Sequence, residues 1–131
     1  MQTLEKIVSD SKNGYTLEGT VIILDNNDVI VVVGGGRDHI GAISLIVHQP
    51  GPDEQTKTTT SILTRPGHRD DEPAKQVGEQ IAAATGRNTA VIAGIHYDSL
   101  TFSDLEILRQ LWVSLSDKII ILIKQQSLSR L

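Results

Sequence analysis

The chain of 131 residues has the length of one ordinary domain, and its 12 basic and 16 acidic residues give a formal charge of -4. This balance offers no basic surface for a nucleic acid, and the absence of cysteine excludes disulfides, thiolate catalysis, iron–sulfur clusters and the common structural zinc sites. With 39% hydrophobic but only 3% aromatic residues, the core must consist mainly of Ile, Val, Leu and Ala.

The N-terminal sequence MQTLEKIVSDSKNG is polar and charged, unlike a signal peptide, and no apolar run reaches the roughly 18 residues of a membrane span. We therefore expect a soluble protein of the reducing cytoplasm, with neither a nucleic acid nor a membrane as partner. The chain is predicted to be a single domain, 1–131, in which segments 1–13 and 49–57 are flexible.

Four strands are predicted in the first half of the chain. Segments 15–24 and 29–34 flank the turn-forming sequence DNND and predict a hairpin. The run HIGAISLIVHQP predicts a third strand, which ends at Pro50, and a fourth strand covers about residues 58–64. Four successive strands favour an antiparallel meander.

Helical periodicity appears in the second half. Apolar residues at 74, 77, 81 and 84, with acids before them and Gly86 after them, predict a first helix. A short strand is predicted in NTAVIAGIHYD, and the apolar spacing over 105–115 predicts a second helix. The tail SDKIIILIKQQSLSRL is β-branched but can be capped at Ser116 or Asp117, and we favour a helix. The predicted class is α+β, a mainly antiparallel sheet with two or three helices packed on it.

The sequence GGGRDHIG, residues 34–41, suggests a binding loop, because glycines let backbone amides approach a phosphate and an arginine adds charge. It matches neither standard phosphate motif. A dinucleotide fingerprint would need a glycine in place of His39 and a helix after it, and a P-loop would need Lys and then Ser or Thr after Gly41. For the glycines alone, a tight turn or bulge is the commoner explanation.

Two further polar clusters, PGHRDD and GIHYD, also lie where predicted elements begin or end, which is where binding groups are often found. Each has a structural explanation. We favour helix capping for Asp70 and Asp71, and His96 can be an ordinary strand-end histidine. Asp98, followed by Ser99 and Thr101, can cap the second helix.

Three of the four histidines, with one acid, can also be combined into a metal site. His39, His68, His96 and Asp98 carry groups that suit zinc or iron, but their spacings match no compact metal motif, and we assign no metal. Without a cysteine or a nucleophile-elbow serine, we assign no catalytic residue either.

The sequences GGGRDHIGAI, PGHRDDEPA and GIHYDSLTFSDLEIL follow one another in a cysteine-free chain of this size. In this combination the chain resembles the prenylated-flavin chaperone family, the small D subunit associated with gallate-type decarboxylases, over about residues 29–115. The resemblance implies a non-enzymatic, homodimeric carrier. Its cargo would be reduced prenylated FMN, which it would deliver to an apo-decarboxylase of the prenylated-FMN-dependent class, acting on aromatic acids. A flavin prenyltransferase is a further candidate partner, and the implied fold is similar to that of proteasome-assembly chaperones.

The resemblance also places the cofactor-binding residues in the three clusters. They are Gly34, Gly35, Gly36, Arg37, His39 and Gly41 in the first, His68, Arg69, Asp70 and Asp71 in the second, and His96 and Asp98 in the third. The amides of Gly35 and Gly36, with Arg37 or Arg69, are candidate phosphate ligands, and the histidines can face the edges of the flavin ring. Acids at the start of the first helix would oppose an anion there unless they turn aside to cap the helix or bind a metal.

Two alternatives remain. One is a metal-dependent hydrolase or lyase in which His39, His68, His96 and Asp98 hold a metal that activates water. The other is a non-catalytic assembly subunit of a decarboxylase, whose surface binds protein rather than a cofactor. Metal content and flavin titrations distinguish these alternatives from a carrier.

Overall fold

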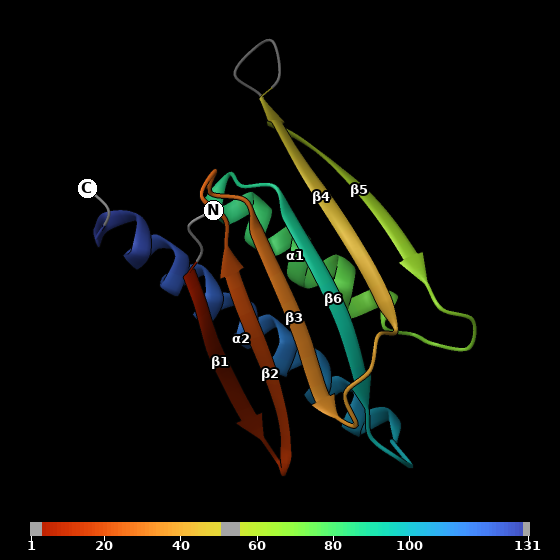
Figure 1. Cartoon of the computed structure of the whole chain (residues 1–131). Coiled ribbons are helices and arrows are strands. Elements are labelled where there is room, and N and C mark those ends of the chain that lie inside the picture. The colour runs from red at the N-terminus through yellow and green to blue at the C-terminus, as the bar shows by residue number, and fades with distance from the viewer. Residues whose placement is uncertain (1–3, 51–55, 130–131) are drawn as a thin grey trace.

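The computed structural model describes residues 4–50 and 56–129, which form a six-stranded sheet with two helices on one of its faces (Figure 1). The predicted α+β class is therefore confirmed. The strands are β1 (Leu4–Lys12), β2 (Tyr15–Ile23), β3 (Val29–Gly36), β4 (Ala42–Pro50), β5 (Thr56–Thr64) and β6 (Thr89–His96). The helices are α1 (Asp71–Thr85) and α2 (Phe102–Ser129).

The strand order is β1-β2-β3-β6-β4-β5, which is not a simple meander. β6 lies between β3 and β4, parallel to β3 and antiparallel to β4, so β3 and β4 are not neighbours. All other pairs are antiparallel. The local sequence predicts each of these strands but not this insertion, because pairing between distant segments leaves no signal in the periodicity.

The N-terminal segment differs from its predicted flexibility. Residues 4–12 form β1, which pairs with β2 along its whole length as an edge strand of the sheet. In the segment 49–57, for which a mobile loop is predicted, residues 49–50 end β4 and residues 56–57 begin β5. Residues 51–55 lie outside the described residues.

Both helices have identifiable ends. At the end of α1, Gly86 adopts the left-handed conformation with φ 69° and donates its N–H to the carbonyl of Ala82 at 2.8 Å, as predicted for a C-terminal glycine. Thr101 precedes α2, and reciprocal hydrogen bonds of 3.0 and 3.1 Å join it to Asp104 in a capping box. Thr101, and not Asp98, therefore caps this helix.

The tail belongs to α2, so there are two helices rather than three in the described residues. Leu115, Ile119 and Ile123 are buried at four-residue spacing, and Ile120 next to Ile119 is also buried whereas Ile121 is 57% exposed. This pattern is helical, because alternation would expose Ile120 or bury Ile121. No stretch of either described helix is apolar and long enough to span a membrane.

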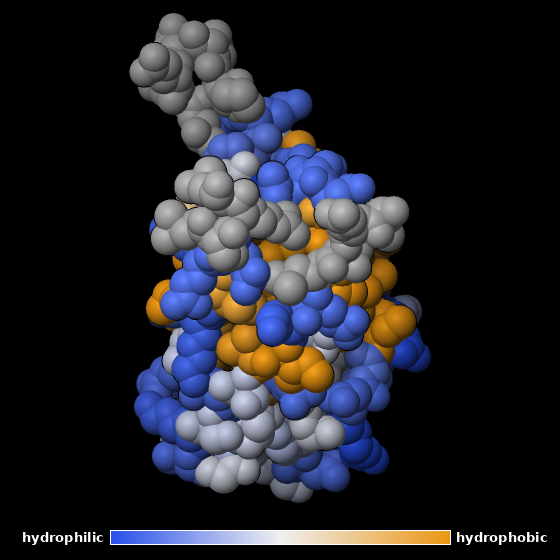
Figure 2. Space-filling view, turned by 60° about the vertical axis from the view of Figure 1, so that its left-hand side comes forward, coloured by the Kyte–Doolittle hydropathy of each residue, from blue (hydrophilic) through white to orange (hydrophobic). Residues whose placement is uncertain are grey.

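The core lies between the sheet and the helices. It contains Leu17, Val31 and Val33 from the sheet and Ile81 and Leu115 from the helices. The other face of the sheet has no helix over it (Figure 1). Figure 2 looks at the side of the molecule where β1 lies, and it shows apolar residues in orange between hydrophilic residues in blue. This side of the molecule therefore exposes some apolar surface.

We expect Thr101→Ala to lower the free energy of unfolding by about 1 kcal/mol, because the N–H of Asp104 loses its acceptor at the start of α2. Urea denaturation followed by circular dichroism measures this loss. Ser103→Ala, at an exposed position in the same turn, is the control and should change stability by less than about 0.5 kcal/mol. Equal losses in the two variants would contradict the capping role.

Candidate functional site

The segment between β3 and β4 crosses the C-terminal end of β6, because β6 lies between these strands. Two backbone hydrogen bonds hold it there: the N–H of Arg37 donates to the carbonyl of His96 at 3.0 Å, and the N–H of Gly41 donates to that of Ala93 at 2.9 Å. A Cβ at Gly94 would lie 1.6 Å from the carbonyl oxygen of His39. Only glycine at this position in β6 therefore admits the crossing.

The glycine triplet ends β3 instead of forming a loop. Gly34, Gly35 and Gly36 pair with residues 94–96 of β6. A Cβ at Gly35 would lie 2.5 Å from the side chain of Leu17, and Gly36 has φ 67° and leaves room for the carbonyl of His96. Close packing accounts for all three glycines, and the loop is the segment after them, residues 37–41.

The crossing places His39 beside the start of α1. Its Nδ1 lies 3.0 Å from the carbonyl oxygen of Arg37 and its Nε2 lies 3.1 Å from Oδ2 of Asp70. A carbonyl oxygen only accepts hydrogen bonds, so Nδ1 carries a proton. The ring centroid of His39 is 5.0 Å from that of His68 and 6.2 Å from that of His96. Three of the predicted site histidines thus meet.

Asp70 occupies the N-cap position of α1, but its side chain makes no capping hydrogen bond, so the capping role predicted for it is wrong. Its Oδ1 instead accepts the N–H of Ile95 at 2.9 Å, and its Oδ2 lies 3.6 Å from Nδ1 of His68. A Cβ at Gly41 would lie 1.8 Å from Oδ2, which explains that glycine. The carboxylate has turned from the helix axis to the histidines.

Asp71 behaves differently from Asp70. It is the first residue of α1, where its charge complements the positive end of the helix dipole, and its Oδ1 lies 3.9 Å from Nε of Arg69. Its position is on the surface beside the site rather than inside it.

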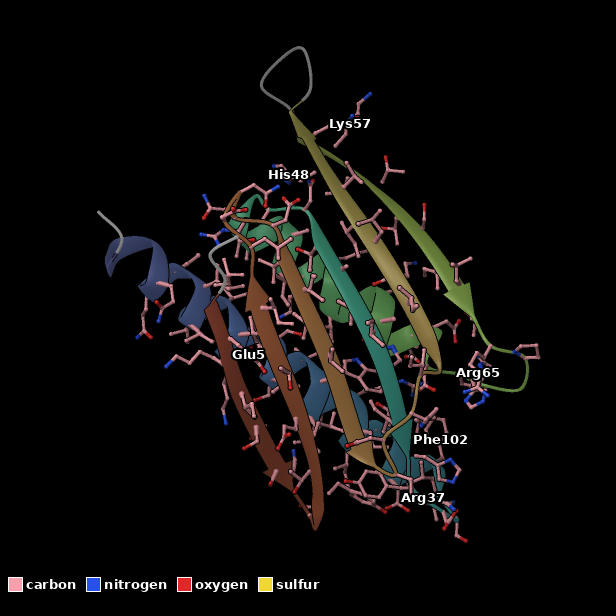
Figure 3. The ribbon with its side chains drawn as sticks, viewed as in Figure 1. Glu5, Arg37, His48, Lys57, Arg65 and Phe102 are labelled. Carbon is pink, nitrogen blue, oxygen red and sulfur yellow. The ribbon has the colours of Figure 1, made fainter. Side chains whose placement is uncertain are left out.

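Arg37, His96 and Asp98 form an exposed group. Nη2 of Arg37 donates to Oδ1 of Asp98 at 2.8 Å, and Nε2 of His96 lies 3.0 Å from the same oxygen. The hydrogen bond with His96 and the charge of Arg37 lower the pKa of Asp98 below its ordinary value. Figure 3 shows Arg37 and Phe102 at the end of the sheet where β3 and β6 end, with His48 at the opposite end.

A cavity of about 450 Å³ lies between the start of α1, the end of β6 and the first half of α2. Its polar wall contains five of the predicted residues, which come from all three clusters: His39, His68, Arg69, Asp70 and His96. Arg37 and Asp98 touch this wall only through His96. The predicted glycines support the wall but do not line the cavity.

The opposite wall was not predicted from the sequence. It is largely apolar and consists mainly of Leu100, Leu105, Leu108 and Trp112. The spacing of Leu105, Leu108 and Trp112 predicts that they lie on the inward face of α2, as they do. Nothing in the local sequence distinguishes a residue that packs on the sheet from one that borders a cavity. The presence of the chain's single tryptophan on this face is the one available signal.

Arg109 and Glu72 add a charged pair to the cavity. Nε of Arg109 donates to Oε1 of Glu72 at 2.7 Å, and a second hydrogen bond joins Arg109 to Glu106. These two carboxylates raise the pKa of Arg109 above its ordinary value. Its charge is therefore already balanced within the protein.

Comparison with known proteins gives a family and a fold. A family model described as the prenylated flavin chaperone LpdD-like domain matches residues 11–124. No curated protein matches the chain. A solved chain from a chaperone complex for yeast 20S proteasome assembly has a TM-score of 0.60 at 15% identity, with 95% of this chain and 98% of that chain covered. This similarity confirms the predicted likeness of the fold to proteasome-assembly chaperones.

We expect Gly41→Ala to displace the carboxylate of Asp70 and to lower the free energy of unfolding by about 1–3 kcal/mol, because the new Cβ would overlap Oδ2. Urea denaturation measures the loss. Gly67→Ala is the control, since a Cβ there meets nothing within 4 Å and adds only the strain of φ 79°, about 1 kcal/mol. A Gly41→Ala variant more stable than the control would refute the close approach of Asp70.

Proposed function

Because the chain belongs to the prenylated flavin chaperone LpdD-like family, we propose that it binds reduced prenylated FMN in this cavity and delivers it, in the cytoplasm, to an apo-decarboxylase of the prenylated-FMN-dependent class. The observation that carries the proposal is the cavity itself. It brings polar residues of three distant sequence clusters against an apolar helix face. A flavin prenyltransferase would supply the cofactor.

The apolar wall suits the face of the flavin ring, and the polar wall suits its edges. A volume of about 450 Å³ lies within the usual range for small-molecule sites, and Leu105, Leu108 and Trp112 offer an apolar surface for a flat ring. His68 and His96 offer hydrogen-bonding groups for the polar edges of that ring.

The phosphate needs a cation that is not already paired tightly. We assign this role to Arg69, which lines the cavity, has a 92% exposed side chain and lies 3.9 Å from its nearest acidic partner, Asp71. Gly35, Gly36 and Arg37 are poorer candidates than the sequence suggests, because they do not line the cavity.

We also propose that the protein is a homodimer joined through the open face of the sheet. Alternation in the strands turns Val32, Ile43, Leu45 and Leu63 away from the helices, and each is between 37% and 75% exposed. Ile43 pairs directly with Leu63 on β5 and with Ile92 on β6, so these side chains form one continuous patch. A second copy placed on this face would bury it.

Binding can be measured anaerobically through the fluorescence of Trp112, which lines the cavity. We expect reduced prenylated FMN to change this fluorescence in a saturable way, and Arg69→Ala to weaken binding about tenfold, because an arginine–phosphate contact is lost. Lys75→Ala, in the second turn of α1 and outside the cavity, should bind normally. If the cofactor changes neither the fluorescence nor the melting temperature, the cavity is not its binding site.

Delivery is tested by mixing the loaded protein with an apo-decarboxylase. We expect decarboxylase activity to appear faster than with the same concentration of free cofactor. If the flavin binds but is not transferred, the chaperone role with this partner is wrong although the cargo is correct.

For the dimer, we expect Leu45→Glu to raise the dissociation constant more than tenfold, because it would bury a charge on the apolar face. Light scattering over a concentration series measures the mass. Ile121→Glu, an exposed apolar position on α2, is the matched control and should leave the dimer unchanged. A wild-type monomer at all concentrations, or equal effects of the two variants, would contradict this interface.

A further inference from the structure

Three potential metal ligands converge on one wall of the cavity. One ligand atom from each of His39, His68 and Asp70 lies within 4.8 Å of the other two. Oδ2 of Asp70 faces Nε2 of His39 and Nδ1 of His68. The two distances that involve Oδ2 are 3.1 and 3.6 Å. Ligands at about 2.0–2.2 Å from a tetrahedral zinc ion lie about 3.3–3.6 Å apart, so small side-chain adjustments suffice to bind a cation at the centre.

The outer contacts of these groups also favour a cation. Nδ1 of His39 donates its proton to the carbonyl oxygen of Arg37, which leaves Nε2 facing the carboxylate. In the neutral ring Nε2 holds a lone pair, and this lone pair and that of the carboxylate oxygen 3.1 Å away repel each other unless a proton or a metal ion lies between them. Metal-bound histidines commonly donate their other N–H to a backbone carbonyl in this way.

Asp70 is arranged in a similar manner. Its Oδ1 accepts the backbone N–H of Ile95, so the carboxylate is fixed with Oδ2 directed to the two histidines. Its side chain is only 7% exposed, and those of His39 and His68 are 20% and 29% exposed. The cluster is therefore shielded, yet all three residues line the cavity.

The carboxylate of this cluster is not the one considered from the sequence. Asp98 is paired with Arg37 and His96, and its side chain is 77% exposed. Asp70 takes the place that the sequence interpretation gave to Asp98.

We propose that His39, His68 and Asp70 bind a divalent transition-metal cation, with a remaining coordination position toward the cavity. Two imidazoles and one carboxylate suit zinc and ferrous iron alike, and both ions leave positions for an oxygen-donor ligand or water. Metal binding at this site requires no flavin, so the test of the metal site is independent of the proposed cargo.

The test is a metal titration of protein without an affinity tag, after treatment with a chelator. Calorimetry with zinc, and with ferrous iron under anaerobic conditions, identifies which ion binds more tightly. We expect one ion per chain, and cobalt in place of zinc should give the visible absorption of a low-symmetry, nitrogen- and oxygen-ligated site.

Variants locate the bound ion. His68→Ala should weaken binding at least tenfold, because one ligand is lost, whereas His48→Ala, at the opposite end of the molecule, should bind normally. His39→Gln provides a second test if His68→Ala fails to fold. The proposal is overturned if neither ion binds more tightly than about 100 µM, or if His48→Ala weakens binding as much as His68→Ala does.

Discussion

The passage of one backbone segment across another at Gly94 is the constraint on which the site depends. A strand inserted between β3 and β4 forces the connection of these two strands to cross it, and the carbonyl of His39 occupies the space that any side chain at position 94 would need. The hydrogen bonds of Arg37 and Gly41 to β6 then fix the crossing at both ends. The position of His39 is therefore set by backbone contacts rather than by its own side chain.

Asp70 connects this crossing to the first helix. Its carboxylate joins α1 to the backbone of β6 through Ile95 and approaches His39 in the crossing segment, so three elements meet at one buried acid. The helix therefore lacks a side-chain cap, and the absence of such a cap usually lowers the free energy of unfolding by about 1 kcal/mol. Such a departure from local preference is typical of positions that serve a site rather than the stability of the element they begin.

The elements of the fold could largely be predicted from the sequence, whereas the contacts between them could not. Turn residues and periodicity identify β2, β5, α1 and α2 because these signals are local. The polar sequence of β1 has no such signal, since an edge strand with one exposed face needs few apolar residues. Gly94 lies unremarked in an ordinary strand sequence, and its importance depends on a segment more than fifty residues earlier.

The candidate site could likewise be predicted from the sequence only in part. Clusters at the ends of elements predicted which regions meet, and His39, His68, Arg69, Asp70 and His96 do line one cavity. The choice between neighbouring acids could not be made from the sequence, because Asp70, Asp71 and Asp98 have similar local surroundings. Only the three-dimensional positions separate a buried carboxylate beside two histidines from two exposed ones.

The fold by itself does not account for a flavin site. The similarity to a proteasome-assembly chaperone chain extends over nearly the whole sheet and both helices at 15% identity, so the same architecture is compatible with very different sequences. In this chain the polar groups are concentrated in the β3–β4 crossing, the start of α1 and the end of β6, while the apolar wall comes from α2. Because these segments are element ends held by a rigid sheet, their side chains can change without loss of the core. The ligand chemistry proposed for this protein therefore depends on a few residues at one end of the sheet, and the sheet supplies their relative positions.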